Sequence, residues 1–473
     1  MQISGFTSGS WDSSADTSFT LTNKFSGQAV AEVANTPHSG LREAIRVLAE
    51  AQQTIKFNAR DRAMALSRAA ELIRAKREQL ISLVQLDTGF ALADATKEVD
   101  RSAETLLLCA EEAKRLTGHM IPIEASAGGA GRLSFTKQIP RGVVCALTPF
   151  NSPLNTVVHK IGPALAAGNS IILKPASLTP LSAHALIEIL LEAGIPPQML
   201  ALVFGSGSQL GSWLAEEQAI DYYAFTGSTE VGQTLHRAVG MRPTQLEMGS
   251  LSSTIVCDDA DLDAAAAAIV AGALRKSGQV CTSVQRVYVQ KDVATELTER
   301  VASLMHQERA GDPADPATTL GPLISPAEAE RVANWFTEAM AGGAQAVIGG
   351  SKDGNVVEPT LLTDVADSAR IMTSELFGPG VIMCEFTELD HAFQQANSTP
   401  FGLAAGIFTS NISRSFQAID DLNVGALYVN QTSSSRIDAM PFSGHKLSGF
   451  GGPEGPAYAI REMSKEKTIT ISR

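Results

Sequence analysis

Gly142-Val-Val-Cys-Ala-Leu147 begins a regular alternation of two kinds of segment along the chain. This run and Ser170-Ile-Ile-Leu-Lys174 are short and apolar, as is typical of strands. Segments 154–167 and 180–193 are longer and predict helices. Strands that alternate with helices indicate a parallel sheet with helices on both faces.

The alternation continues toward the C-terminus. Predicted strands at 200–204 and 222–225 each lead into a glycine turn and then a helix. After Gly249 the pattern restarts, which predicts a second α/β domain. Its strands are expected at 253–257, 286–289, 344–348, 380–383 and 404–408, and its helices at 262–276, 293–308 and 326–340.

The two ends of the chain differ from this pattern. The first 40 residues are rich in Ser, Thr and Gly and predict an arm laid on the main body, with strands at 19–22 and 29–33. Segment 41–77 has apolar residues at three- and four-residue steps, which predict a helix. Lys467-Thr-Ile-Thr-Ile-Ser472 alternates strictly, so we expect a strand that joins a sheet elsewhere or another subunit.

The composition is that of a globular protein with a large core. Hydrophobic residues make up 44% of the 473 residues and charged residues 18%, enough for about two to four domains. The formal net charge of −13 argues against nucleic acid or an anionic membrane as the main partner. The apolar stretch 264–273 is too short to span a bilayer.

The cysteines bear on the cellular compartment. There are five, and none belongs to a Cys-x-x-Cys pair. This argues against a disulfide scaffold or a zinc site, so we expect no metal and a reducing, cytoplasmic compartment. The N-terminus has no basic segment followed by an apolar run, so we expect no signal peptide. The cysteines in apolar patterns, expected to be buried and inert, are Cys109, Cys145, Cys257 and Cys384.

Cys281 differs from the other cysteines in its setting, Gly278-Gln-Val-Cys-Thr282. A polar turn at the mouth of a strand leaves a thiol reachable, as a nucleophile must be. Taken alone, a lone cysteine is more often a small buried residue. Glu247, in Leu246-Glu-Met-Gly249, changes this balance, because a partly desolvated carboxylate can serve as a general base. The alternative for Glu247 is a solvated side chain in a domain hinge.

Other polar residues near strand ends are candidates for binding. Asn151, with the backbone N–H of Cys281, could hold an oxyanion, although an ordinary turn asparagine is the alternative. Gly227-Ser-Thr-Glu-Val-Gly232 follows a strand, and it offers Ser228 as a helix cap and a helix N-terminus for a pyrophosphate.

Three further candidates for a nucleotide site have weaker signals. Gly205-Ser-Gly-Ser-Gln-Leu-Gly211 spaces its last glycine one residue further than the dinucleotide fingerprint requires. Lys174 ends a strand where an ammonium could meet a ribose or phosphate, and a surface lysine is the alternative. Glu375 could bond a ribose hydroxyl, and a solvated helix end is the alternative.

Several motifs, in a fixed order from about Asn35 to the end, resemble the aldehyde dehydrogenase superfamily. They are Pro149-Phe-Asn151, Lys174-Pro175, Phe225-Thr-Gly-Ser228, Leu246-Glu-Met-Gly249, Gly278-Gln-x-Cys281, Glu375-Leu-Phe-Gly-Pro379 and Pro441-Phe-Ser-Gly-His-Lys446.

The resemblance implies an NAD- or NADP-dependent oxidation of an aldehyde to the free carboxylic acid. Cys281 would attack the aldehyde, and Asn151 with the Cys281 amide would stabilise the oxyanion. Hydride transfer to the nicotinamide would leave a thioester. Glu247 would then activate the water that hydrolyses it.

The resemblance also implies an α/β fold with two Rossmann-like parallel-sheet domains and a small β oligomerisation element, in a homodimer or homotetramer. Residues 1–117 and 141–249 would form the NAD(P)-binding domain, 250–445 the catalytic domain, and 118–140 with 455–473 the oligomerisation element.

The implied binding residues fall into two groups. For the coenzyme they are Lys174, Ser177, Gly205, Phe225, Gly227, Ser228, Glu375 and Phe377. For the substrate they are Arg101, Ser152, Val280, Thr282 and Ser434.

Three positions bear on specificity. Many NAD-using members have a glutamate at the position of Ser177, so the serine predicts that NADP is accepted. Val280 stands where members that take phosphorylated aldehydes often have arginine. Arg101 could hold a carboxylate or sulfonate and, with the surrounding sequence, favours a small polar or anionic aldehyde. The alternative for Arg101 is a salt bridge to Glu98 or Glu104 on the same helix.

Three other functions compete with this interpretation. The first is a broad-specificity enzyme for aliphatic or aromatic aldehydes. The second is a non-catalytic ligand-binding protein of the same fold. The third is a cysteine hydrolase in which Cys281 pairs with a histidine such as His159, although a structural histidine fits the apolar helix around His159 better.

Overall fold

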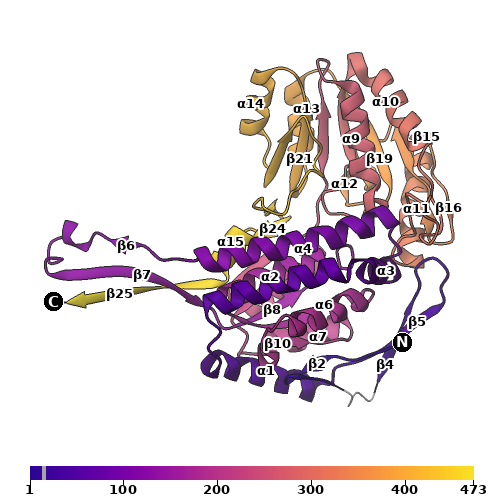
Figure 1. Cartoon of the computed structure of the whole chain (residues 1–473). Helices are drawn as coiled ribbons and strands as arrows, with labels where there is room; N and C mark the ends of the chain where they lie inside the picture. The colour runs from indigo at the N-terminus through magenta and orange to yellow at the C-terminus, as the bar shows by residue number, and fades with distance from the viewer. Residues whose placement is uncertain (13–16, 473) are drawn as a thin grey trace.

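The computed structural model describes residues 1–12 and 17–472 (Figure 1). Residues 13–16 of the expected N-terminal arm and residue 473 lie outside the described part. Two large sheets with helices on their faces make up the body, and a narrow three-stranded arm extends away from it (Figure 1). The predicted α/β class is therefore confirmed.

The first large sheet contains the strands that open the alternating pattern. Its strand order is β24 (Gly449–Phe450), β12 (Thr244–Glu247), β11 (Tyr222–Thr226), β8 (Val143–Leu147), β9 (Ser170–Lys174), β10 (Leu200–Leu202), β2 (Phe6–Thr7) and β3 (Ser10–Trp11). The five strands from β12 to β10 are parallel, and β24 and β2 add antiparallel at the two sides. Their carboxyl ends therefore meet at one edge of the sheet, which is where open α/β sheets bind ligands.

Both faces of this sheet are covered by helices, because apolar residues point to each side. Val144 and Ala146 of β8 belong to one core, and Val143 and Cys145 belong to the other. The first core includes α2 (Ala59–Ala75), α4 (Leu92–Arg115), α5 (Asn155–Ala167) and α6 (Pro180–Glu192), and the second includes α1 (His38–Thr54), α7 (Gly207–Glu216) and α8 (Thr229–Val239).

The second large sheet comes from the part of the chain after Gly249. Its order is β15 (Gln345–Ile348), β18 (Thr360–Thr363), β19 (Gly380–Phe386), β14 (Arg286–Gln290), β13 (Ser253–Val256), β21 (Ala404–Phe408) and β22 (Ala426–Val429). The helices α9 (Leu262–Leu274) and α10 (Lys291–Met305) share one core with it, and α11 (Pro326–Ala341), α13 (Leu389–Asn397) and α14 (Ile412–Asp421) are the main helices on the other side.

The tail strand pairs within its own chain. β25 (Ser464–Ser472) runs antiparallel to β7 (Arg132–Pro140) along its whole length, and β6 (Met120–Ile121) adds to the other edge of β7. This confirms that the tail joins a sheet elsewhere in the chain. These three strands form the projecting arm at the left of Figure 1.

Two helix predictions were wrong at their boundaries. Segment 41–77 is two helices, because α1 ends at Thr54 and Asn58 caps α2 by accepting a hydrogen bond from the backbone N–H of Asp61 (3.1 Å). The helix expected to reach residue 276 ends at Leu274, because Lys276 has a left-handed φ of 53°. Within the described ranges, no helix is both long enough and apolar enough to cross a membrane.

Candidate active site

A cavity of about 620 Å³ lies at the carboxyl ends of the parallel strands of the first sheet. The segment after β8 contributes Asn151, β9 contributes Lys174 and β12 contributes Glu247. The part of the chain after Gly249, which forms the second sheet, contributes Cys281 and Glu375. The cavity therefore brings together residues from both halves of the chain.

Most of the predicted site residues line this cavity. The exceptions are Gly205 and Ser434, which are not among its lining residues. The predicted residues that line it are Arg101, Asn151, Ser152, Lys174, Ser177, Phe225, Gly227, Ser228, Glu247, Val280, Cys281, Thr282, Glu375 and Phe377.

Cys281 is half-buried, at the wall of the cavity. Burial raises the pKa of its thiol to about 12, with the carboxyl of Glu375 acting in the same direction and the guanidinium of Arg436 against it. Cys109, Cys145 and Cys257 are buried within apolar cores, as expected, whereas Cys384 is half-buried against two of them. Only Cys281 of the five cysteines lines the cavity.

Asn151 reaches the loop that carries Cys281. Its side-chain amide donates a hydrogen bond to the backbone carbonyl of Gln279 (2.8 Å), two residues before the cysteine. An amide N–H donor from the segment after β8 thus contacts the loop that carries the thiol, and both residues line the cavity. Such a donor can stabilise negative charge that develops on a carbonyl oxygen.

Glu247 is a buried carboxyl without a hydrogen-bond partner. Its side chain is 2% exposed, and neither oxygen is bonded to any group in the described part of the chain. Burial raises the pKa of Glu247 well above its usual value, and the nearby carboxylate of Glu454 adds to the shift. A carboxyl with a raised pKa can serve as a general base once it is deprotonated.

Glu454 stays ionised because cations surround it. Lys160 lies 2.5 Å from its carboxylate and Arg436 lies 2.9 Å away. Burial alone would raise the pKa of Glu454, but these two cations hold that pKa far below its usual range. The sequence motifs give no indication of Glu454 or Lys160, and Arg436 is not among the predicted site residues.

Arg101 has a different ion-pair partner from either expected one. Its guanidinium binds both carboxylate oxygens of Asp438, at 2.8 and 2.6 Å, rather than Glu98 or Glu104. His159 also bonds to Asp438 (2.8 Å). Because Asp438 neutralises Arg101, the interpretation of Arg101 as a free anion ligand loses its main support.

Arg275 was missed by the sequence analysis. It lines the cavity and has no ion-pair partner among the described residues. Its one side-chain hydrogen bond in that part of the chain goes to the hydroxyl of Thr282 (3.2 Å), next to Cys281. The site therefore has an unpaired guanidinium close to the thiol.

Most of the predicted coenzyme residues also line the cavity. Ser228 caps α8 by accepting a hydrogen bond from the backbone N–H of Val231 (3.4 Å), which confirms its predicted role as a helix cap. The ammonium of Lys174 donates to the backbone oxygen of Pro175 (3.1 Å), and burial lowers the Lys174 pKa to about 8. Ser177 donates to the backbone oxygen of Gly205 (2.7 Å).

A cysteine–histidine pair is not present. In the described residues, Nε2 of His159 is engaged with Asp438 and Nδ1 has no partner, and no hydrogen bond links the ring to Cys281. Burial lowers the pKa of His159, so the ring favours its neutral form. This geometry does not support the cysteine hydrolase alternative.

Comparisons with known proteins cover almost the whole chain. The Aldehyde dehydrogenase family matches residues 11–469. The 3-sulfolactaldehyde dehydrogenase of Priestia aryabhattai is 39% identical over 99% of this chain and 97% of that protein, and the lactaldehyde dehydrogenase of Methanococcus vannielii is 34% identical over 95% and 96%. A solved NADP-dependent glyceraldehyde-3-phosphate dehydrogenase of Bacillus halodurans C-125, complexed with NADP, is 31% identical, with a TM-score of 0.97 over 100% of this chain and 99% of that one.

The raised pKa of Cys281 predicts how its reactivity depends on pH. Because the thiolate is a small fraction of the thiol well below a pKa of about 12, alkylation of Cys281 by iodoacetamide in the coenzyme-free protein should speed up about tenfold per pH unit. Mass spectrometry of the labelled peptide measures the rate, with Cys281→Ala as the control. A rate that levels off near about pH 8.5, the ordinary thiol value, would contradict this reading.

Proposed function

This chain belongs to the aldehyde dehydrogenase family, and we propose that it oxidises a small anionic aldehyde to the free carboxylic acid. It is an oxidoreductase that acts on aldehydes and uses NAD or NADP. The observation that carries the substrate proposal is the unpaired guanidinium of Arg275 beside Cys281. A carboxylate or sulfonate on the substrate would supply the anion that this arginine lacks.

The charges around the cavity support this choice. Among the described residues, Arg101 is paired with Asp438 and Arg436 with Glu454, whereas Arg275 forms no ion pair and the carboxylate of Asp94 acts on it only from a distance. Burial lowers the pKa of Arg275, and Arg101 nearby adds to the effect. An anionic group would relieve both the desolvation and the repulsion. A neutral aldehyde would leave the guanidinium unpaired.

The first chemical step is assigned to Cys281 and Asn151. The thiolate of Cys281 adds to the aldehyde carbon, forming the carbon–sulfur bond of a thiohemiacetal and placing negative charge on the oxygen. The amide of Asn151 and the backbone N–H of Cys281 would hold that oxygen. Release of a hydride from the carbon then leaves a thioester on Cys281.

Three of the predicted coenzyme residues in the cavity lining, Gly227, Ser228 and Lys174, suit a dinucleotide. A Cβ at Gly227 would lie 2.6 Å from the Phe225 ring, so a larger residue would have to displace this wall of the cavity. Ser228 and the N-terminus of α8 suit a pyrophosphate. The buried ammonium of Lys174 has N–H groups to spare for a ribose or phosphate oxygen. When bound there, NAD or NADP accepts the hydride.

Glu247 is assigned to the hydrolysis of the thioester. Its ionised carboxyl would take a proton from water as the water adds to the thioester carbon. The carbon–sulfur bond then breaks, the Cys281 thiolate leaves, and the product acid gives its remaining proton to the solvent and departs as a carboxylate. The raised pKa of Glu247 means that hydrolysis should accelerate as pH rises through that pKa, because the base is active only when deprotonated.

Replacement of the base should separate the two half-reactions. In Glu247→Gln, thioester formation persists while hydrolysis slows by about 100-fold or more. Rapid mixing should show a burst of reduced coenzyme equal to one per active site, followed by a slow steady rate. The loss of both the burst and the steady rate would instead place Glu247 in the first half-reaction.

Arg275 should discriminate between two substrates that differ only in a sulfonate. The names of two relatives supply this matched pair, 3-sulfolactaldehyde and lactaldehyde. Arg275→Met should lower kcat/KM for 3-sulfolactaldehyde by about 10- to 100-fold, the value of a charge-assisted hydrogen bond, and change lactaldehyde little. Absorbance of the reduced coenzyme measures both rates.

Arg101→Met is the matched comparison. If Arg101→Met rather than Arg275→Met removes the preference for the sulfonate, the sequence-based assignment of Arg101 is correct. Equal turnover of aliphatic and aromatic aldehydes by the unchanged protein would favour the broad-specificity alternative. No turnover with any aldehyde would favour the non-catalytic one.

Measurement of kcat/KM for the unchanged protein with NAD and with NADP tests whether NADP is accepted and preferred. Ser177 places a hydroxyl rather than a carboxylate at the edge of the cavity, so no charge there repels a 2′-phosphate. Higher kcat/KM with NAD than with NADP would contradict this preference. The cytoplasmic location stays a prediction.

We also propose that copies of this chain associate in a homodimer or homotetramer. Ile412, Phe416 and Ile419 share one face of α14 and are 56–68% exposed. This apolar face flanks the sheet whose edge strand is β22, and the strand β25 forms the edge of the arm. Sedimentation of the full chain measures its mass, and a monomer at micromolar concentration would contradict the proposal.

A further inference from the structure

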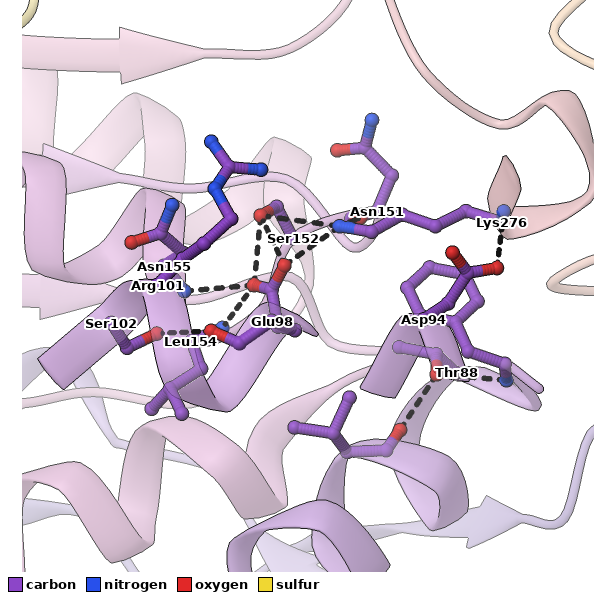
Figure 2. Close-up of polar contacts among 12 residues, drawn as sticks. Thr88, Asp94, Glu98, Arg101, Ser102, Asn151, Ser152, Leu154, Asn155 and Lys276 are labelled. Carbon is purple, nitrogen blue, oxygen red and sulfur yellow. Dashed lines mark hydrogen bonds and ion pairs between the residues drawn. The ribbon is translucent and has the colours of Figure 1, made fainter. Parts of the chain in front are cut away.

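One carboxylate of α4 holds the segment that follows Asn151. Glu98 accepts hydrogen bonds from the hydroxyl of Ser152 (2.7 Å) and from the backbone N–H groups of Leu154 (3.2 Å) and Asn155 (2.8 Å) (Figure 2). These donors form the turn between β8 and α5. Glu98 therefore fixes the backbone on which the Asn151 amide is mounted.

The loop that leads to Cys281 begins in an unfavourable conformation. Lys276 and Ser277 have φ values of 53° and 56°, in the left-handed region that residues with a Cβ rarely occupy. Asp94 of α4 accepts a hydrogen bond from the backbone N–H of Lys276 (2.6 Å), and Ser277 donates to the backbone oxygen of Gly321 (2.7 Å). Such strain persists where surrounding contacts enforce it, and it concentrates at functional sites.

The side chain of Lys276 connects this loop to the Asn151 segment. Its ammonium donates to the carboxylate of Glu98 (2.7 Å) and to the backbone oxygen of Asn151 (2.9 Å) (Figure 2). The side chain is 9% exposed, and neither of these contacts involves the Cys281 thiol. Lys276 thus touches the backbone of the oxyanion donor from a position five residues before the nucleophile.

These contacts join two parts of the molecule that have separate sheets. Asn151 follows β8 of the first sheet, whereas Lys276 follows α9, which packs on the second. The strained loop and the Glu98 carboxylate together set how these parts meet. A shift of about 1 Å between the reacting groups can cost about 100-fold in rate, so such a junction affects catalysis strongly.

We propose that Glu98 and Lys276 are a positioning pair that aligns the Asn151 amide with the Cys281 thiol. The proposal rests on the proposed function, because it requires Asn151 and Cys281 to act on the same carbonyl. The chemical roles remain with those two residues, and the pair acts through their backbone.

The test separates positioning from simple charge neutralisation. Lys276→Met leaves Glu98 as a buried, unpaired charge, so it should lower both the unfolding temperature and kcat. The double variant Lys276→Met/Glu98→Gln removes that charge. It should recover the unfolding temperature while kcat stays down by about 100-fold, because no ammonium then contacts the Asn151 backbone.

Two substrates separate positioning from direct binding of the anion. Because the pair acts on the carbonyl geometry, kcat should fall equally for lactaldehyde and 3-sulfolactaldehyde, with KM within about threefold of the unchanged protein. A rise in KM for the sulfonate alone would overturn the proposal and make Lys276 an anion ligand. Alkylation of Cys281 by iodoacetamide needs no oxyanion donor, and its rate should stay within about twofold.

The controls keep the result interpretable. Lys76→Met breaks a partly exposed ion pair with Glu192 (2.6 Å) remote from the cavity lining, and it should leave kcat unchanged. Recovery of kcat in the double variant, or no loss in Lys276→Met, would overturn the proposal. If Lys276→Met does not fold, Glu98→Gln is the milder variant and should still lower kcat. Failure of the unchanged protein to oxidise any aldehyde would instead refute the proposed function.

Discussion

The carboxylate of Glu98 is buried where α4, the start of α5 and the loop before Cys281 meet. Burial of a charge is costly unless the charge is paired and hydrogen-bonded. Although burial alone raises the pKa of Glu98, the ammonium of Lys276 and the hydrogen bonds hold it below its usual range. Because the Glu98 charge must stay paired and hydrogen-bonded, it holds these three segments together. Their positions set the geometry around Cys281.

A second pattern is the pairing of charges around the cavity. Arg101 with Asp438 and Lys160 with Glu454 are cations and anions contributed by distant parts of the chain. Burial and the carboxylate of Glu454 disfavour the charge of Glu247, and they outweigh the cations Lys160 and Arg436. An acid that resists ionisation and an arginine without an anion are both uncommon in a packed interior. Glu247 and Arg275 are these two exceptions, and both have proposed roles in the reaction.

The sequence could predict the parts of the site that depend on local motifs. The alternation of strands and helices placed Asn151 and Lys174 near strand ends, and parallel pairing brings such ends together. It placed Glu247 only at the end of the first α/β pattern, because the strand β12 was not predicted. Cys281 differs from the other four cysteines because it lies in a polar turn, Gly278-Gln-Val-Cys-Thr282, and this difference is visible in the sequence.

The remaining parts depend on pairings that no local rule specifies. Arg101 is 337 residues from Asp438, so the rule for helical neighbours pointed to the wrong partners. Lys276 was predicted to end a helix, because it closely follows the alanine-rich run 264–273. The one available signal was two adjacent cations, Arg275 and Lys276, at the end of an otherwise apolar segment.

The arm has a consequence for biosynthesis. β25 pairs with β7 residue by residue, from Ser464 with Pro140 to Ser472 with Arg132, across more than half of the chain. On a ribosome, one edge of β7 therefore stays unpaired while the second sheet is still being synthesised. That open edge is available to chaperones or to other nascent chains until residue 472 has emerged. Completion of the arm therefore comes after synthesis of both large sheets, and any assembly that uses the β25 edge must follow that step.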